Sequence, residues 1–112
     1  MTREEAVRSL VCFDRPVAML RECLDAFPFD WDAPPLATLK AEHLLTVLSR
    51  WERGEVSAQE VEDWANLLEV RDDLDHDSSN SAVASAVFDL ANPELQGPVE
   101  LVAPALRKRL KL

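Results

Sequence analysis

The carboxylates of residues 71–79 are the feature of this sequence closest to a metal site. Four aspartates fall within this run, and alternating oxygen ligands are typical of calcium-binding loops. A loop that started at Asp73 would need glycine where Ser78 stands and a bidentate glutamate where Ala84 stands. A loop that started at Asp75 fails in the same way. The run therefore predicts no EF-hand, and only weak, adventitious binding of divalent ions stays open for it.

Carboxylate pairs could instead hold magnesium for phosphate chemistry. Two pairs resemble the paired motifs of all-α nucleotide pyrophosphohydrolases: Glu52 with Glu55, and Glu69 with Asp72. A metal cage of that kind needs both carboxylates on one helical face. Gly54 is expected to end the helix between the first two, so that they would not share a face. A magnesium-dependent nucleotide hydrolase is therefore the alternative function and not the preferred one.

The cysteines and histidines offer little for nucleophilic catalysis. Cys12 and Cys23 have no second pair at zinc spacing, and each lies among apolar neighbours, so we expect two buried, reduced thiols. His43 falls inside a helical pattern and His76 inside the acidic run. Neither a nucleophile elbow nor a glycine-rich phosphate loop occurs. We therefore expect a protein that is not an enzyme, with no catalytic residue, no cofactor and no bound metal.

Charge is distributed very unevenly along the chain, whose formal net charge is −9. Residues 54–100 hold twelve acids and a single base, Arg71, whereas residues 101–112 hold four bases and no acid. This acidic balance disfavours nucleic acid or an anionic membrane as the partner, because phosphate binding needs clustered Lys and Arg. A solvated acidic face that maintains solubility is one explanation. Complementarity to a cationic protein partner is the other.

Helices are the elements that must position these side chains. A chain of 112 residues that is 47% hydrophobic can bury one core and is not disordered. Two glycines and no tyrosine are a poor composition for a β-sandwich, and no segment has a strand pattern. The N-terminus shows no signal peptide, and no stretch approaches the roughly 20 apolar residues of a membrane span. We expect a cytoplasmic, all-α, single-domain bundle (residues 1–112) of five or six helices.

Capping signals define where the helices begin. Thr2 with Glu5 has the spacing of a capping box, and Pro16 suits the first turn of a second helix. Thr38 is expected to cap a third helix, and Asn80 or Ser81 a fifth. The pairs at 92–93 and 97–98 punctuate the chain before a last helix, in which Pro104 is expected to form a kink or delay the start.

A helical hairpin is predicted around Gly54. This glycine is expected to end the third helix, and Ser57 with Glu60 forms a second capping box three residues later. So short a turn predicts that the two helices pack antiparallel. Trp51 and Trp64 lie symmetrically about the turn and are expected to be at least partly buried in one core.

Two connections are expected between helices. Residues 27–35 contain three prolines, so neither a helix nor a central strand can run through them. The aromatic side chains of Phe29 and Trp31 either fold back over the core or form an exposed anchor for a partner. Residues 71–81 predict a solvent-exposed loop, either mobile or held by a counter-charge, for which the basic residues 107–111 are the internal candidate. Neutralising its four aspartates is expected to leave the fold intact.

Residues 50–66 read RWERGEVSAQEVEDWAN. This segment resembles small helical bacteriocin-immunity proteins of polymorphic-toxin neighbourhoods, including the colicin D immunity group, in which one helix ends at a turn of the type Gly-Glu-Ile/Val-Ser-Ala and another begins. The similarity continues through residues 71–73 and 90–95. It implies a small, acidic, helical protein that blocks the active site of a toxin by charge mimicry.

The preferred function is therefore a non-enzymatic, acidic binding protein, an immunity-like or antitoxin-like inhibitor of a cationic toxin such as a nuclease. A helical scaffold of unknown role is a further alternative. Four residues follow helical spacing on the face of the fourth helix opposite Trp64: Glu62, Asn66, Glu69 and Asp73. The candidate partner-binding residues are six carboxylates and one aromatic side chain: Glu62, Glu69, Asp72, Asp73, Asp75, Asp77 and Trp31.

Overall fold

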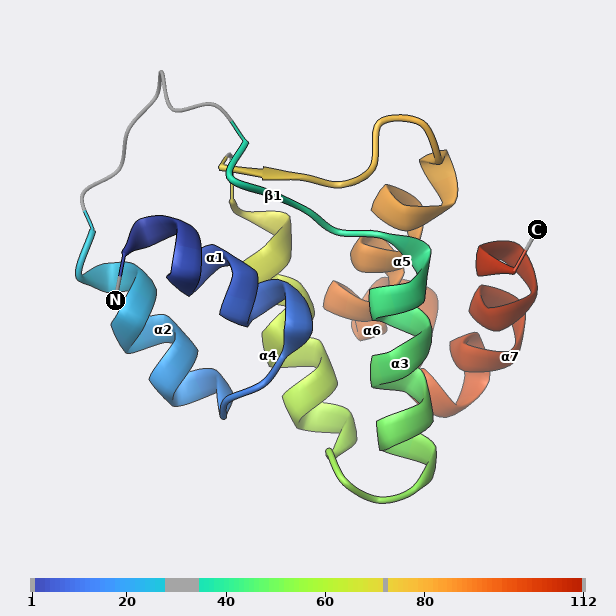
Figure 1. The fold of residues 1–112 in the computed structure, drawn as a ribbon. Coiled ribbons are helices and arrows are strands. Elements are labelled where there is room, and N and C mark those ends of the chain that lie inside the picture. The colour runs from blue at the N-terminus through green and yellow to red at the C-terminus, as the bar shows by residue number, and fades with distance from the viewer. Residues whose placement is uncertain (1, 28–34, 72, 112) are drawn as a thin grey trace.

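Helices dominate the part of the chain that the structure describes, residues 2–27, 35–71 and 73–111 of a computed structural model (Figure 1). The predicted all-α fold is confirmed. The helices are α1 (Arg3–Cys12), α2 (Val17–Asp25), α3 (Ala41–Glu52), α4 (Ala58–Glu69), α5 (Ser81–Ala91), α6 (Pro93–Gln96) and α7 (Val99–Leu110). The strands β1 (Ala37–Thr38) and β2 (Leu74–Asp75) complete the described elements. In these ranges no helix has the length and apolar character needed to cross a membrane.

The two predicted capping boxes are both present. The Thr2 hydroxyl accepts the N–H of Glu5 at 3.1 Å, and the Glu5 carboxylate accepts the N–H of Thr2 at 3.1 Å. Ser57 and Glu60 make the same reciprocal pair at 3.1 and 3.0 Å. Each box satisfies two N–H groups that have no partner within the helix, which is why α1 and α4 begin where the sequence predicts.

One predicted cap is wrong. Thr38 lies in β1 and does not cap α3, which begins three residues later with Lys40 at its N-cap. The cap is built differently, because Nδ1 of His43 accepts the backbone N–H of Lys40 at 2.9 Å. The prediction at the other end of this helix holds, since Gly54 follows it with a left-handed φ of 78°.

The core centres on Trp64, which is fully buried. Its indole N–H donates to the carbonyl of Leu10 at 2.6 Å, and its ring stacks on Phe13 with the centroids 5.3 Å apart. Arg50 also contacts Phe13. Its guanidinium lies over the Phe13 ring, 5.1 Å from the centroid, and donates to the Phe13 carbonyl at 2.6 Å. These contacts hold Phe13 in its left-handed conformation (φ 47°) at the end of α1.

Helix α4 lies between the N-terminal helices and α5 (Figure 1). Its most extensive contact is with α5. Trp51 is half-buried against the same core that encloses Trp64, as predicted. Antiparallel packing of α3 directly along α4 stays a prediction. The short turn connects these two helices, but the apolar face of α4 packs mainly against elements other than α3.

Three apolar or thiol positions are less buried than expected. Cys12 is exposed and Cys23 is half-buried, so the prediction of two buried thiols is wrong for Cys12. Cys12 is the last residue of α1 and lies between the buried Val11 and Phe13. Leu101, an apolar residue of α7, is 73% exposed. That helix begins at Val99 and contains Pro104, so its start is not delayed.

The short parallel strand pair was not predicted. Ala37 pairs with Leu74 and Thr38 with Asp75. Two residues per strand are too few to produce a recognisable alternation in the sequence. The N–H of Leu36 donates to the carbonyl of Asp73 at 2.8 Å, which ties the acidic run to the segment before α3.

Candidate functional site

The seven predicted partner-binding residues do not form one surface. Asp72 and Trp31 lie outside the described residues. The Phe29–Trp31 segment lies outside them too, so its two predicted roles, covering the core or anchoring a partner, stay predictions. The other five divide into three environments. Asp73 is buried, Asp75 and Asp77 lie in the connection before α5, and Glu62 and Glu69 lie on α4.

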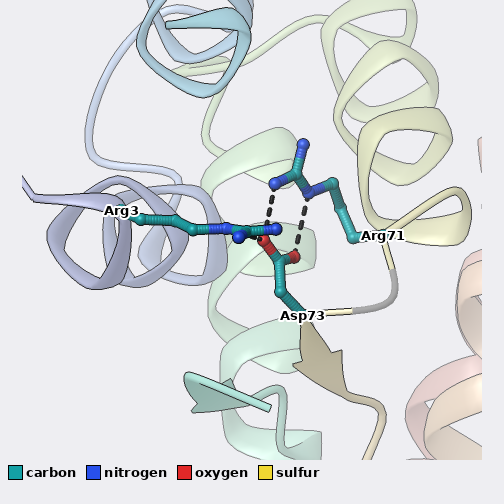
Figure 2. A network of polar contacts seen from close by, with 3 residues as sticks. All are labelled: Arg3, Arg71 and Asp73. Atoms are coloured by element: carbon teal, nitrogen blue, oxygen red, sulfur yellow. Dashed lines mark hydrogen bonds and ion pairs between the residues drawn. The ribbon is translucent and has the colours of Figure 1, made fainter. Parts of the chain in front are cut away.

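Asp73 is not a surface residue. It is only 3% exposed, and two arginines hold its carboxylate (Figure 2). Arg71 donates to both carboxylate oxygens, from Nε at 3.0 Å and from a terminal nitrogen at 2.6 Å, and Nε of Arg3 donates to Oδ2 at 3.0 Å. The predictions that Asp73 contributes to a partner-binding surface and that its loop is solvent-exposed are therefore wrong at this position. The buried Leu74 beside it strengthens the correction.

The pKa of Asp73 reflects two opposed effects. Burial by itself raises the pKa of this carboxyl, because a low-dielectric surrounding disfavours the charged form. The hydrogen bonds and charges of Arg71 and Arg3 together outweigh burial, so the pKa lies below its ordinary value of 3.8. Asp73 is thus an ionised, internally paired group at neutral pH.

The counter-charge for the acidic run is not the basic C-terminal end. Among the described residues, Arg107 pairs with Glu52 at 2.8 Å and Arg109 with Asp89 at 2.6 Å. The run is held instead by Arg71 beside it and by Arg3 from the first turn of α1. Because Asp73 carries this contact, neutralising the whole run is no longer expected to leave the fold unperturbed.

Asp75 and Asp77 order the connection by local hydrogen bonds. Oδ1 of Asp75 accepts the N–H of Ser78 at 3.2 Å, and Oδ1 of Asp77 accepts the N–H of Ser79 at 3.3 Å. Asp77 also has a left-handed φ of 49°. Both aspartates are half-buried, and neither forms an ion pair with a described cation.

Glu62 and Glu69 lie on the flank of α4 that faces the α5–α6 junction. The Glu69 carboxylate accepts an amide N–H of Asn92 at 3.3 Å, and the Glu62 carboxylate accepts an amide N–H of Gln59 at 2.7 Å. Neither glutamate has an ion-pair partner within the described ranges. This flank therefore keeps its negative charge uncompensated.

Two adjoining hollows lie along this flank. The smaller, of about 120 Å³, has apolar walls from α4, α5 and α7, among them Val61, Leu90 and Val99. The larger, of about 370 Å³, lies beside α6 and is lined by Asn66, Glu94 and Leu95 among others. Glu62 and Pro93 line both hollows, so the two adjoin along α4.

Two exposed leucines lie at these hollows. Leu95, in the single turn of α6, lines the larger hollow and is 72% exposed. Leu101 is equally exposed and its side chain packs beside Gly97, which lines the smaller hollow. The sequence reasoning missed Leu95, Glu94 and the hollows. The available sequence signal was the pair of prolines at 93 and 98. They limit α6 to a single turn, and Leu95 in this turn is exposed.

The described residues contain no group of three or more His, Cys, Asp or Glu side chains placed to hold a metal ion. Comparisons with known proteins found no matching family model, no similar curated protein and no similar solved structure.

Proposed function

We propose that this chain is a non-enzymatic binding protein for a cationic protein partner and acts as an immunity-like or antitoxin-like inhibitor of a toxin. The observation that carries the proposal is the acidic excess of residues 54–100, which hold twelve acids against one base. That base, Arg71, is already paired with Asp73. The predicted residues Glu62, Glu69, Asp75 and Asp77 have no cationic partner among the described residues.

Uncompensated charge of one sign favours association with the opposite sign. Summed over a surface, it raises the encounter rate with a basic partner and suppresses encounters with acidic ones. Residues 1–53 are nearly balanced, with nine acids and seven bases, so the excess belongs to the part of the chain that contains α4, α5 and α6. A basic toxin would be attracted to this part first.

The test is capture of partners from the native host, followed by kinetics of the purified pair. We expect the captured partner to be basic, and its association rate to fall as salt rises, since the attraction is screened over about 10 Å at 0.1 M salt. Inhibition of the partner's toxic activity by this chain would complete the test. A partner without net positive charge, or an association rate independent of salt, would contradict the proposal.

A matched pair of charge variants makes the test specific. The site variant removes four charges and leaves the buried Asp73 intact: Glu62→Gln, Glu69→Gln, Asp75→Asn and Asp77→Asn. The control variant removes four exposed charges from the balanced part of the chain: Glu4→Gln, Glu22→Gln, Asp25→Asn and Glu42→Gln. We expect the site variant to associate about tenfold more slowly at low salt and the control variant to change by less than about twofold. Equal effects of both variants would mean that the charge acts without a defined surface.

A further inference from the structure

We infer that the two adjoining hollows along α4 form one docking groove for a partner protein. The groove receives a short basic segment of that protein, in which arginine or lysine adjoins leucine-like residues. This inference rests on the proposed function and assigns its binding surface. The groove is defined by Glu62 and Pro93, which line both hollows, with Leu95 at one end and Leu101 beside the other.

The smaller hollow of the groove has mainly apolar walls, and the larger one has a mixed lining. Val61, Leu90 and Val99 line the smaller hollow, and its volume of about 120 Å³ suits a single side chain rather than a helix. The exposed side chain of Leu95 extends the apolar surface to the larger hollow. A leucine-like residue of the partner would cover this surface, and removing its apolar area from water would favour binding.

The charge of the groove commits it to a basic occupant. Glu62, Asp89 and Glu94 line the hollows, and no lysine or arginine is among their described lining residues. Asp89 is already paired with Arg109, which leaves Glu62 and Glu94 for an incoming cation. An arginine or lysine suits the site because its apolar stem can lie along the walls while its charged end reaches a carboxylate.

Glu62 is the expected anchor. It lines both hollows and is half-buried. Among the described residues, its carboxylate accepts a hydrogen bond only from the neutral amide of Gln59. An incoming guanidinium would replace or join that neutral donor with a charged one, and charge-assisted hydrogen bonds are the stronger kind.

A second copy of this chain fits the groove poorly. Each copy carries a formal net charge of −9, so two copies repel one another. The basic C-terminal end does not present the required combination: Arg107 and Arg109 are engaged within their own chain, with Glu52 and Asp89, and the described leucines of this end, Leu106 and Leu110, are buried in the core. A basic segment of another protein meets neither obstacle.

The experiment is an NMR titration of the isotope-labelled chain with synthetic peptides. The probe is acetyl-Ala-Leu-Arg-Arg-Leu-Ala-amide. One control peptide keeps the arginines and replaces both leucines by serine, and the other keeps the leucines and replaces both arginines by glutamate. We expect saturable binding of the probe with shift changes confined to residues 58–66 and 89–102. The serine peptide is expected to bind about fivefold more weakly, and the glutamate peptide not to bind.

Matched variants locate the contact. Glu62→Gln and Leu95→Ala are each expected to weaken binding of the probe by about threefold to tenfold. Two control variants change residues outside the hollows. Glu42→Gln removes one negative charge from α3, and Val70→Ala shortens an apolar side chain that is 70% exposed. Each should change the affinity by less than about twofold. All four positions are exposed or half-buried, so the variants are expected to fold.

The outcomes separate the groove from the proposed function. Shift changes centred on residues 73–80, equal binding of the serine peptide, or equal effects of Glu42→Gln and Glu62→Gln would overturn the groove. So would the absence of saturable binding. In each of these cases a basic partner whose association slows with salt would still support the proposed function. Conversely, groove binding of the probe without any cationic partner in the host would support the groove and contradict the proposed function.

Discussion

Two acidic regions of this molecule lie in opposite environments. Asp73 is buried, and Arg3 and Arg71 satisfy both of its oxygens (Figure 2). Within the described ranges, Glu62 and Glu69 on the flank of α4 accept hydrogen bonds only from neutral amides, and Glu62 lines both open hollows. The difference teaches that the number of carboxylates does not define a binding surface. The position of the internal cations decides which carboxylates stabilise the fold and which can meet a partner.

Removing the buried carboxylate is expected to have the largest effect on stability. Asp73→Ala leaves two arginines facing an empty site, and breaking a buried ion pair from one side costs about 3 kcal/mol or more. We expect a lower free energy of unfolding by that amount in urea denaturation. Asp75→Ala, two residues further along the chain, is the matched control, and it should lose less than about 1 kcal/mol. Equal losses would mean that the arginines do not distinguish Asp73 from its neighbours.

The two arginines are expected to contribute unequally. Arg71 makes two hydrogen bonds to Asp73 and Arg3 makes one. Arg71→Ala should therefore lower the free energy of unfolding by about 2 kcal/mol, and Arg3→Ala by about 1 kcal/mol. A double-mutant cycle with Asp73 measures each coupling. A larger coupling for Arg3 would contradict the geometry.

Acid should weaken the same contact with a smaller loss in the free energy of unfolding than Asp73→Ala, because protonation neutralises Asp73 but leaves its side chain in place. Its pKa in the folded protein lies below the ordinary value of 3.8. The stabilisation is therefore present above pH 3.8, decreases as the pH falls below 3.8, and is lost once the pH is below the folded-state pKa. In urea denaturation between pH 6 and pH 3, the difference in the free energy of unfolding between the wild type and Asp73→Asn should become smaller as the pH falls below 3.8. A constant difference across this range would contradict the role of the ionised carboxylate.

The smallest effect is expected at the open flank. Glu62→Gln with Glu69→Gln should change the free energy of unfolding by less than about 0.5 kcal/mol, since neither residue has an ion pair to lose within the described ranges. Thermal denaturation would measure this. A loss comparable to that of Asp73→Ala would show that the flank is structural and would remove the contrast between the two regions.

Short-range signals explain what could be predicted at the candidate site. The helical period correctly placed Glu62 and Glu69 on the flank of α4 away from the buried Trp64, because side chains on a helix are set by local geometry. The same period was extended too far when it placed Asp73 on that flank. Helix α4 ends at Glu69, and the chain then turns into β2.

By itself, the sequence determined the helical class and the capped starts of α1 and α4. Thr2 with Glu5, and Ser57 with Glu60, lie three residues apart and find one another in any chain that turns into a helix there. Tertiary structure alone decided the environment of the charges. Arg3 lies 70 positions from Asp73, and Leu10 lies 54 positions from Trp64. Contacts across such separations exist only once the helices have packed. Arg71 lies two positions from Asp73 in the sequence, but only the packing decides that Asp73 is buried and meets Arg3 as well.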